Sequence, residues 1–371
     1  MTEIYLIRHT QAEGNLYRMM QGQWDGNVTA LGLKQIDALA ERFRDIHIDA
    51  VYSSDLYRAW KTATGITRYN GLEITKTPLL REINMGPWEA QYFGNVFYRE
   101  PELAKYFVSD SDKWIVPGAE TFQDVKNRAY PELVRIAEAH GGQSVAVVSH
   151  GVAIRCILSV ILDKPLSDTV SLPICDNTAV SKFIYENGSF NPVYINDASH
   201  IKSLKVPEWS KNVSLRDECF NPADNSSWYI KCYEDAWFSA KGSLNGFNGN
   251  TYYGAALKHH YADNNAVLKI FDNDKPVGLV ELDTQRDADE NCGWITLLYL
   301  IPEYRYMGYG LQLLARAMFY YRQLGRNALR LTVNAGNTIG LRFYEKTGFV
   351  EIDKSNHNSN TVILMEKKLN V

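Results

Sequence analysis

Two short apolar runs, each leading into a histidine, are the feature that most constrains the fold. Residues 4–7 (Ile-Tyr-Leu-Ile) lead into Arg8 and His9, and residues 145–149 (Val-Ala-Val-Val-Ser) lead into His150. Such runs are typical of buried strands. In an open α/β sheet, catalytic groups gather outside the carboxyl ends of the parallel strands, so the two histidines can converge although they are far apart in sequence. The alternative is that each histidine only caps its strand.

The segments around these histidines decide between the two interpretations. They are residues 8–15 (Arg-His-Thr-Gln-Ala-Glu-Gly-Asn), 25–32 (Asp-Gly-Asn-Val-Thr-Ala-Leu-Gly), 53–59 (Ser-Ser-Asp-Leu-Tyr-Arg-Ala), 80–89 (Leu-Arg-Glu-Ile-Asn-Met-Gly-Pro-Trp-Glu) and 149–151 (Ser-His-Gly). In this order and spacing they resemble the histidine phosphatase superfamily, which includes the cofactor-dependent phosphoglycerate mutases. The resemblance covers roughly residues 1–195 and implies an α/β protein whose N-terminal domain is a three-layer α/β/α, phosphoglycerate mutase-like domain.

The resemblance also assigns roles that suit the chemistry of a phosphomonoester. Such an ester carries about −1.5 to −2 charges near neutral pH, and guanidinium groups bind it with forked donors. By the family's pattern, His9 is the nucleophile that forms a phosphohistidine, and Glu82 is the acid and base that protonates the leaving alcohol and deprotonates water. The positions that would bind the phosphate are Arg8, Asn15, Arg58 and His150. This chemistry requires no metal or cofactor.

Departures from the family's pattern leave the activity of this half open. The family commonly has glycine and threonine where this chain has Thr10 and Ala12, so a hydroxyl contact to the phosphate is missing or moved. Residues 91–114 are short and mixed in charge, whereas mutases usually carry a longer basic insertion there, so a small-molecule phosphatase is favoured. The alternatives are a phosphoglycerate mutase and a catalytically weak sensor of a phosphorylated metabolite. The aromatic residues of that stretch form either a lid over the substrate or, more commonly, a packed helical cap.

The chain is too long for one such domain. At 371 residues it exceeds what a single core usually organises. Apolar segments 179–185 and 190–195 flank Asn187-Gly188, a pattern that predicts a closing hairpin, and polar residues follow. We therefore predict a first domain over residues 1–196, a linker over 197–212 and a second domain over 213–371.

The second domain has its own strand-turn-helix signature. An apolar run at 293–300 is followed by the segment 305–310 (Arg-Tyr-Met-Gly-Tyr-Gly), after which apolar residues recur at helical spacing. A glycine-bearing turn that opens a helix leaves backbone N–H groups free for a pyrophosphate. With a strand at 328–333 and the segment 337–349, these features resemble the GNAT superfamily of N-acetyltransferases, which implies an α+β acyl-CoA N-acyltransferase fold that binds acetyl-CoA. By this resemblance Tyr344 protonates the departing thiolate, and the cofactor-binding positions are Leu298, Leu300, Arg305, Gly308, Tyr309, Gly310 and Asn337.

The acceptor side of this domain is less defined by the sequence. Glu281 is a candidate general base, although a solvated carboxylate is the commoner role for such a residue. Helices are predicted at 228–240 and 251–262, and their many aromatic residues either bind the acceptor or, more commonly, pack in the core. His259 and His260 are adjacent on a helix and have no carboxylate or cysteine at ligand spacing, so we assign no metal site.

Composition limits the possible partners. A formal charge of −4 gives no general basic face for nucleic acid, and no apolar run reaches the length that spans a membrane. Five cysteines without a CxxC pair favour reduced thiols in the cytoplasm. We expect a bifunctional enzyme that hydrolyses a small phosphomonoester and transfers an acetyl group from acetyl-CoA to an amine, with both sites acting on one pathway or one small molecule. The oligomeric state is left open.

Overall fold

The computed structural model divides the chain into two compact units, Met1–Glu208 and Trp209–Val371, and each is described by itself. It describes residues 1–169, 171–172, 175–204, 214–357 and 360–369. The elements of the first unit are β1 (Thr2–Arg8), α1 (Glu13–Tyr17), α2 (Ala30–Phe43), β2 (Ala50–Ser53), α3 (Tyr57–Ile66), β3 (Ile74–Lys76), α4 (Phe93–Arg99), α5 (Pro101–Ser109), α6 (Phe122–Ala139), β4 (Ser144–Ser149), α7 (Gly151–Ile161), β5 (Val180–Glu186) and β6 (Ser189–Asp197).

The sheet of the first unit has the strand order β3-β2-β4-β1-β5-β6. Strands β3, β2, β4 and β1 run parallel, and β5 and β6 are antiparallel additions at one edge. The two predicted strands are neighbours, with Arg8 of β1 paired to Ser149 of β4. The carboxyl ends of β1 and β4 therefore meet at one point of the sheet edge.

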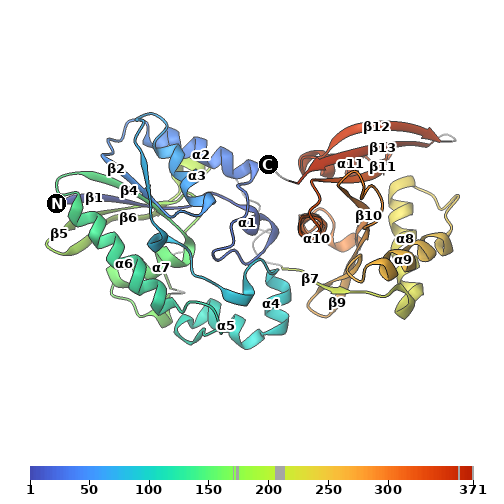
Figure 1. Cartoon of the computed structure of the whole chain (residues 1–371), viewed down its shortest axis with the longest axis horizontal. Coiled ribbons are helices and arrows are strands. Elements are labelled where there is room, and N and C mark those ends of the chain that lie inside the picture. Colours follow the sequence, from blue (N-terminus) through green and yellow to red (C-terminus); the bar gives the residue numbers. More distant parts are fainter. Residues whose placement is uncertain (170, 173–174, 205–213, 358–359, 370–371) are drawn as a thin grey trace. The chain divides into compact units, whose positions relative to one another are not determined.

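Helices cover both faces of this sheet, which confirms the three-layer prediction (Figure 1). Because side chains alternate along a strand, Ile4 and Leu6 pack in a cluster with α6 and α7, whereas Tyr5 and Ile7 pack in a cluster with α2 and α3. All four side chains are at most 5% exposed. A strand buried on both faces explains why the run is apolar at every position.

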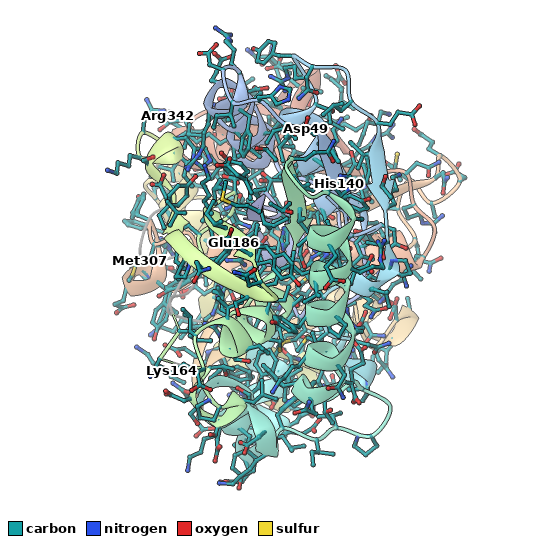
Figure 2. All side chains as sticks on the ribbon, turned by 90° about the vertical axis from the view of Figure 1, so that its left-hand side faces the viewer. Asp49, His140, Lys164, Glu186, Met307 and Arg342 are labelled. Carbon is teal, nitrogen blue, oxygen red and sulfur yellow. The ribbon has the colours of Figure 1, made fainter. Side chains whose placement is uncertain are left out.

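The predicted hairpin closes the sheet. Asn187 (φ 49°) and Gly188 (φ 79°) form the two-residue turn between β5 and β6, and both adopt the positive φ that such a turn requires. Glu186 at the end of β5 and His140 at the C-terminal end of α6 can be followed in Figure 2.

The first residues of the predicted linker pack on this unit. Arg42 of α2 forms an ion pair with Asp197 (2.8 Å) and a hydrogen bond with the Nδ1 atom of His200 (3.2 Å). Residues 205–212 of that linker lie outside the described part of the chain.

Helices α4 and α5 form a packed cap. The ring of Trp114 lies edge-on to Trp88 and Phe107, with centroids 5.4 and 5.3 Å apart, and Phe107 also contacts Phe122 of α6. Trp88 and Trp114 are at most 1% exposed, whereas Tyr98 is 52% exposed. These central aromatic side chains therefore serve packing.

The second unit contains one mixed sheet with the strand order β12-β13-β11-β10-β9-β8-β7. Its elements are β7 (Arg216–Cys219), α8 (Ser226–Lys241), α9 (Gly249–Ala262), β8 (Val267–Asp272), β9 (Lys275–Asp283), β10 (Cys292–Leu300), α10 (Gly310–Gln323), β11 (Ala328–Asn334), α11 (Thr338–Lys346), β12 (Val350–His357) and β13 (Asn360–Lys368). Helices α8 and α9 lie on one side of β9 and β10, and α10 lies on the other (Figure 1). The predicted helices at 228–240 and 251–262 and the predicted strand at 293–300 are thus confirmed.

Within the described residues, no helix is both long and apolar enough to cross a membrane.

Candidate active sites

The predicted nucleophile His9 and the predicted phosphate ligand His150 are brought together at the sheet edge. His9 follows β1, His150 is the N-cap of α7, and their ring centroids lie 5.0 Å apart. Both are buried, at 2% and 0% exposure. The Nδ1 atom of His9 lies 2.6 Å from the carbonyl oxygen of Thr10. Because a carbonyl oxygen only accepts, Nδ1 carries the hydrogen and the lone pair of Nε2 is left for attack on phosphorus.

The environment keeps both histidines neutral. Burial, followed by the positive charges of Arg58 and Arg8, holds the pKa of His9 well below the ordinary value of 6.5. Burial and Arg58 lower the pKa of His150 in the same way. A neutral imidazole is the form that can act as a nucleophile.

Arg8 and Arg58 supply buried hydrogen-bond donors near His9. The Arg58 guanidinium is held by the carbonyls of Trp24 (3.0 Å) and Gly22 (2.6 Å), and that of Arg8 by the carbonyl of Cys175. Within the described part of the chain, the Nε atoms of both arginines and both ring nitrogens of His150 are buried without a hydrogen-bond partner. Buried polar atoms are normally paired, so this group of nitrogens is arranged to receive an anion from outside the chain.

Asn15 and Thr10 contribute differently. The Asn15 side-chain oxygen accepts from the N–H of Ala12 (3.0 Å) at the start of α1, which fixes the side chain beside the site. The Thr10 hydroxyl donates to the carbonyl of Gly32 (2.6 Å) and is 0% exposed. The hydroxyl at position 10 therefore stabilises the loop after β1 and does not point at a phosphate.

The predicted acid and base Glu82 lies at the N-terminus of α7. Its Oε1 atom accepts from the N–H groups of Val152 (3.0 Å) and Ala153 (3.1 Å). A methyl group built on Gly151 would lie 3.6 Å from Glu82 Oε2 and 3.7 Å from Arg8 Nε. The carboxylate and the Arg8 guanidinium thus face the same turn of α7, next to His150.

Arg128 of α6, which sequence reasoning missed, holds the backbone of Glu82. It donates to the carbonyls of Arg81 (2.7 Å) and Glu82 (2.9 Å), and its ion pair with Glu120 (2.7 Å) orients it. Glu120 in turn accepts from the N–H of Asn84 (2.8 Å). Arg128 is a positioning residue. Its contacts with the carbonyls of Arg81 and Glu82 span 47 and 46 residues, so no local sequence signal indicated them.

We expect Arg128→Ala to lower kcat for phosphate release by about 10²-fold with little change in KM, because Glu82 loses its fixed position while the anion-binding nitrogens remain. Arg128→Lys should recover part of kcat. Steady-state kinetics with a single phosphomonoester measures this. A lower free energy of unfolding together with a raised KM, and no partial recovery of kcat in Arg128→Lys, would instead indicate a structural role alone.

In the second unit, β10 and β11 separate after a short contact. They pair only from Cys292 with Ala328 to Trp294 with Arg330, so the edge of β10 from residue 295 to 300 has no strand beside it on this side within the described chain. The predicted positions Leu298 and Leu300 lie on this stretch. On the other edge, the pairing of β10 with β9 is irregular between Ile295 and Leu297. An open strand edge offers backbone N–H and C=O groups to an extended, amide-bearing ligand.

The start of α10 offers further free donors. Among the described residues, the backbone N–H groups of Gly308, Tyr309 and Gly310 have no acceptor, and Tyr309 caps the helix without a side-chain hydrogen bond. Gly308 has a positive φ of 77°. With the helix dipole, these groups form an anion site of the kind that binds a pyrophosphate.

Arg305 differs from the others, because its guanidinium is used within the unit. It donates to the carbonyl of Leu300 (2.7 Å), to the hydroxyl of Ser239 (2.8 Å) and to Asp235. These contacts join the end of β10 to α8. We therefore limit any contribution of Arg305 to cofactor binding to its backbone.

Asn337 and Tyr344 lie at opposite ends of α11. The Asn337 side-chain oxygen caps the helix by accepting from the N–H of Gly340 (2.9 Å). Tyr344 packs edge-on against Phe343 and Phe349, with ring centroids 5.3 and 5.4 Å away. Burial raises its pKa to about 12, so its phenol keeps the proton at neutral pH.

The sequence favoured a solvated carboxylate at Glu281, and the structure shows a buried one instead. It is 0% exposed and accepts hydrogen bonds from Tyr229 (2.6 Å) and from the Nδ1 atom of His259 (2.7 Å), and Nε2 of His259 lies 3.4 Å from Asp283. Burial lowers the pKa of His259, but the hydrogen bond and charge of Glu281 outweigh this and raise it. His259 does therefore have carboxylate partners, from strand β9.

In the described part of the chain, no group of three or more His, Cys, Asp or Glu side chains is arranged to hold a metal ion.

Two family models match the chain. The model described as the histidine phosphatase superfamily (branch 1) covers residues 4–198, and the model described as the acetyltransferase (GNAT) family covers residues 222–349. A protein named "probable phosphoglycerate mutase GpmB" from Salmonella choleraesuis is 32% identical over 190 residues, which are 51% of this chain and 88% of that protein.

Solved structures resemble the first unit. YhfR of Bacillus stearothermophilus is 29% identical with a TM-score of 0.53, covering 54% of this chain and all of its own. A mycobacterial glucosyl-3-phosphoglycerate phosphatase, solved with VO3, is 24% identical with a TM-score of 0.50, covering 53% of this chain and 99% of its own. The second of these likenesses shows the fold alone.

Proposed function

Because the chain belongs to the histidine phosphatase superfamily and carries a GNAT acetyltransferase domain after it, we propose that it is a bifunctional enzyme. The first domain hydrolyses a small phosphomonoester through a phosphohistidine. The second transfers an acetyl group from acetyl-CoA to an amine. The partners are thus a phosphorylated metabolite and an amine acceptor.

One observation carries the phosphatase half: a neutral His9 with Nε2 free stands beside buried, unpartnered nitrogens of Arg8, Arg58 and His150. In the proposed reaction, His9 Nε2 attacks phosphorus and the bond to the alcohol oxygen breaks. Glu82 gives a proton to the leaving alkoxide. A water molecule then attacks the phosphohistidine, Glu82 takes its proton, and phosphate leaves. The arginines stabilise the charge on the phosphoryl oxygens in both steps.

Hydrolysis is favoured over mutase activity by the cap. Helices α4 and α5 carry packed aromatic rings and no excess of basic residues, since Arg99, Lys105 and, just after α5, Lys113 are balanced by acidic neighbours. Phosphoglycerate mutase activity is the second candidate, motivated by the relative that bears that name. A sensor without turnover is the third.

The test is phosphate release from a panel of phosphomonoesters in buffer containing a metal chelator. Release without any bisphosphate primer supports a phosphatase. Interconversion of phosphoglycerates that depends on a bisphosphate primer supports a mutase. Binding of an ester without turnover supports the sensor.

The acetyltransferase half is supported by the fit of the second unit to acetyl-CoA. The free N–H groups before α10 suit its pyrophosphate, and the open edge of β10, with Leu298 and Leu300, suits its amide-bearing arm. Bound there, acetyl-CoA would supply the reactive thioester. Asn337 would contact the arm and Tyr344 would protonate the thiolate. Glu281 is the candidate general base that accepts a proton from the amine. Its hydrogen bond with His259 would connect the buried carboxylate to the amine.

We expect Gly310→Val to weaken acetyl-CoA binding by about tenfold or more. A Cβ atom on Gly310 would lie 3.1 Å from the Phe343 ring, and a branched side chain would cover the N–H groups at the helix start. The control is Gly254→Ala in α9, where no atom lies within 4 Å of the added methyl. Isothermal titration calorimetry measures both. Unchanged affinity in Gly310→Val would place the cofactor elsewhere.

A reducing compartment such as the cytoplasm fits the five cysteines, all of which are free thiols. We further propose that the two activities serve one pathway. A change in the rate of phosphate release on adding the acetylated product, or in the rate of acetyl transfer on adding the dephosphorylated product, would support this coupling. Independence of the two rates would count against it.

A further inference from the structure

In the second unit, a group of polar side chains lies between α9 and β9. His259 of α9 stands between two carboxylates of β9: its Nδ1 atom lies 2.7 Å from Oε1 of Glu281, and its Nε2 atom lies 3.4 Å from Oδ2 of Asp283. The other carboxylate oxygen of Glu281 accepts from Tyr229 of α8 at 2.6 Å. Both oxygens of Glu281 are thus used within the unit.

Only one side of this group reaches solvent. The Glu281 side chain is 0% exposed, whereas those of His259 and Asp283 are 15% and 24% exposed. Because a carboxylate only accepts, its contact with Nδ1 places a hydrogen there and leaves the lone pair of Nε2 free in the neutral ring. Nε2 lies too far from Asp283 for an ordinary hydrogen bond. An incoming donor can therefore reach Nε2 and Asp283, but not Glu281.

The neighbouring strand β10 adds a hydroxyl group without a partner. Trp294 of β10 pairs with Asp283. Leu297 pairs with Glu281, and Thr296 stands in the irregular step between the two pairs. Among the described residues, Thr296 Oγ1 is buried and has no hydrogen-bond partner. Buried hydroxyl groups are normally paired, and a bulge often redirects a side chain beside an active site. This step also lies where β10 separates from β11, at the edge proposed for the arm of acetyl-CoA.

The charges of this group leave room for one cation. Glu281 and Asp283 carry two negative charges, and the imidazole of His259 carries at most one positive charge. Tyr229 and Tyr233 of α8 face the same carboxylate and stay neutral, because burial raises the pKa of both phenols. The group is therefore negative in both states of the imidazole, which favours a cationic ligand over a neutral one.

We propose that Asp283 and Thr296 bind the amino group of the acetyl acceptor, that His259 takes a proton from it, and that the acceptor is an alkyl amine, which arrives as an ammonium ion. One proton moves from the ammonium nitrogen to Nε2 of His259, the lone pair of the amine becomes free for acetylation, and the imidazolium passes the proton to water. The hydrogen bond from Nδ1 to Glu281 stabilises the imidazolium, so Glu281 acts only through His259. This proposal rests on the acetyltransferase function proposed above and names the class of acceptor for that site.

The test compares two ring amines of similar shape on the full chain with acetyl-CoA. Cyclohexylamine is an ammonium ion at neutral pH, and aniline is a neutral arylamine. We expect the wild type to prefer cyclohexylamine, and Asp283→Asn to raise its KM about tenfold or more while changing the value for aniline by less than about twofold. The asparagine keeps the oxygen that accepts from the N–H groups of Gln285 and Arg286 (3.1 Å each), so the turn after β9 is retained.

The control is Asp289→Asn, which removes an exposed carboxylate from the segment between β9 and β10. It should leave both KM values unchanged. Equal effects of Asp283→Asn on the two amines, or an effect as large in Asp289→Asn, would overturn the proposal.

Thr296→Val separates binding from folding. Valine has nearly the same shape, and the hydroxyl has no partner in the described part of the chain, so the free energy of unfolding should not fall. The KM for cyclohexylamine should nevertheless rise about threefold or more. An unchanged KM, or a loss of stability in its place, would contradict the role of Thr296.

His259→Gln should lower kcat for cyclohexylamine by about 10²-fold with little change in KM. Burial lowers the pKa of His259, but the carboxylates of Glu281 and Asp283 outweigh this and raise it above 6.5. In the wild type, kcat/KM should therefore fall as the pH drops through this raised pKa, since a protonated ring cannot take the proton. Asp283→Asn should move this limb to lower pH, and His259→Gln should remove it. Ionisation of the amine itself is common to all three proteins, so the same limb in all of them would contradict the role of His259.

If no amine is acetylated, the proposed acetyltransferase function fails, and the site is tested by binding alone. The eight histidines are labelled with ¹³C in the ring, and the NMR signal of His259 is assigned with His259→Gln. A change of this signal on adding cyclohexylammonium that disappears in Asp283→Asn would still support the site. No change, or the same change with aniline, would contradict it.

Discussion

His9→Ala should abolish phosphate release, with kcat falling by about 10⁴-fold or more, because the phosphohistidine that we propose at this position can then no longer form. In the proposed reaction the nucleophile is the neutral imidazole of His9, which is fixed by Thr10 and kept unprotonated by burial and by Arg58 and Arg8. For the same reason, the acid limb of kcat/KM in the wild type should lie below the ordinary histidine value of 6.5 if it reports His9. A malachite green assay over a range of pH measures both.

His47→Ala is the matched control, since the His47 side chain is 83% exposed and pairs with Asp49 at the surface. It should leave the rate unchanged. Phosphate release by His9→Ala at a tenth of the wild-type rate would mean that water attacks the ester directly, and the phosphohistidine would have to be abandoned.

Glu82→Gln should lower kcat by about 10² to 10⁴-fold, because glutamine can neither protonate the leaving alkoxide nor take a proton from water. The choice of leaving group separates the role of Glu82 as acid from its role as base. With an alkyl phosphate the first step is slowed and no burst appears. With 4-nitrophenyl phosphate the leaving group needs no proton, so one equivalent of nitrophenolate should appear in a burst before a slow steady state.

Stopped-flow absorbance and rapid quench measure the two esters. Glu73→Gln, at an exposed position of the same unit, serves as control and should behave as wild type. If the first turnover of both esters is slowed equally in Glu82→Gln, the carboxylate acts on binding and not on proton transfer.

Local sequence signals were sufficient to predict several of the helices and strands. Continuous apolar runs predicted β1, β4 and β10, and Asn187-Gly188 predicted the hairpin, because strand burial and turn conformation depend on adjacent residues. The convergence of His9 and His150 followed from one topological rule, since parallel neighbours end at the same edge.

Contacts between distant residues could not be predicted in this way. Two partners of Arg305 are 66 and 70 residues away in α8, so the sequence did not reveal them, and Arg305 was placed among the cofactor-binding positions by the resemblance alone. Glu281 is bound by Tyr229 and His259, 52 and 22 residues away, and only the packing of α8 and α9 on the sheet removes it from water. An isolated charged residue in a sequence carries no information on whether it is paired, which is also why Arg128 was missed.

The proposed phosphohistidine at His9 is tested most directly by trapping it. The wild-type chain is mixed with a ³²P-labelled phosphomonoester, quenched within milliseconds in alkali, where phosphohistidine is stable, and digested for mass mapping. We expect one labelled site, His9, with a label that is lost in acid and absent from His9→Ala. Rapid phosphate release without any labelled histidine, or a label on another residue, would contradict it.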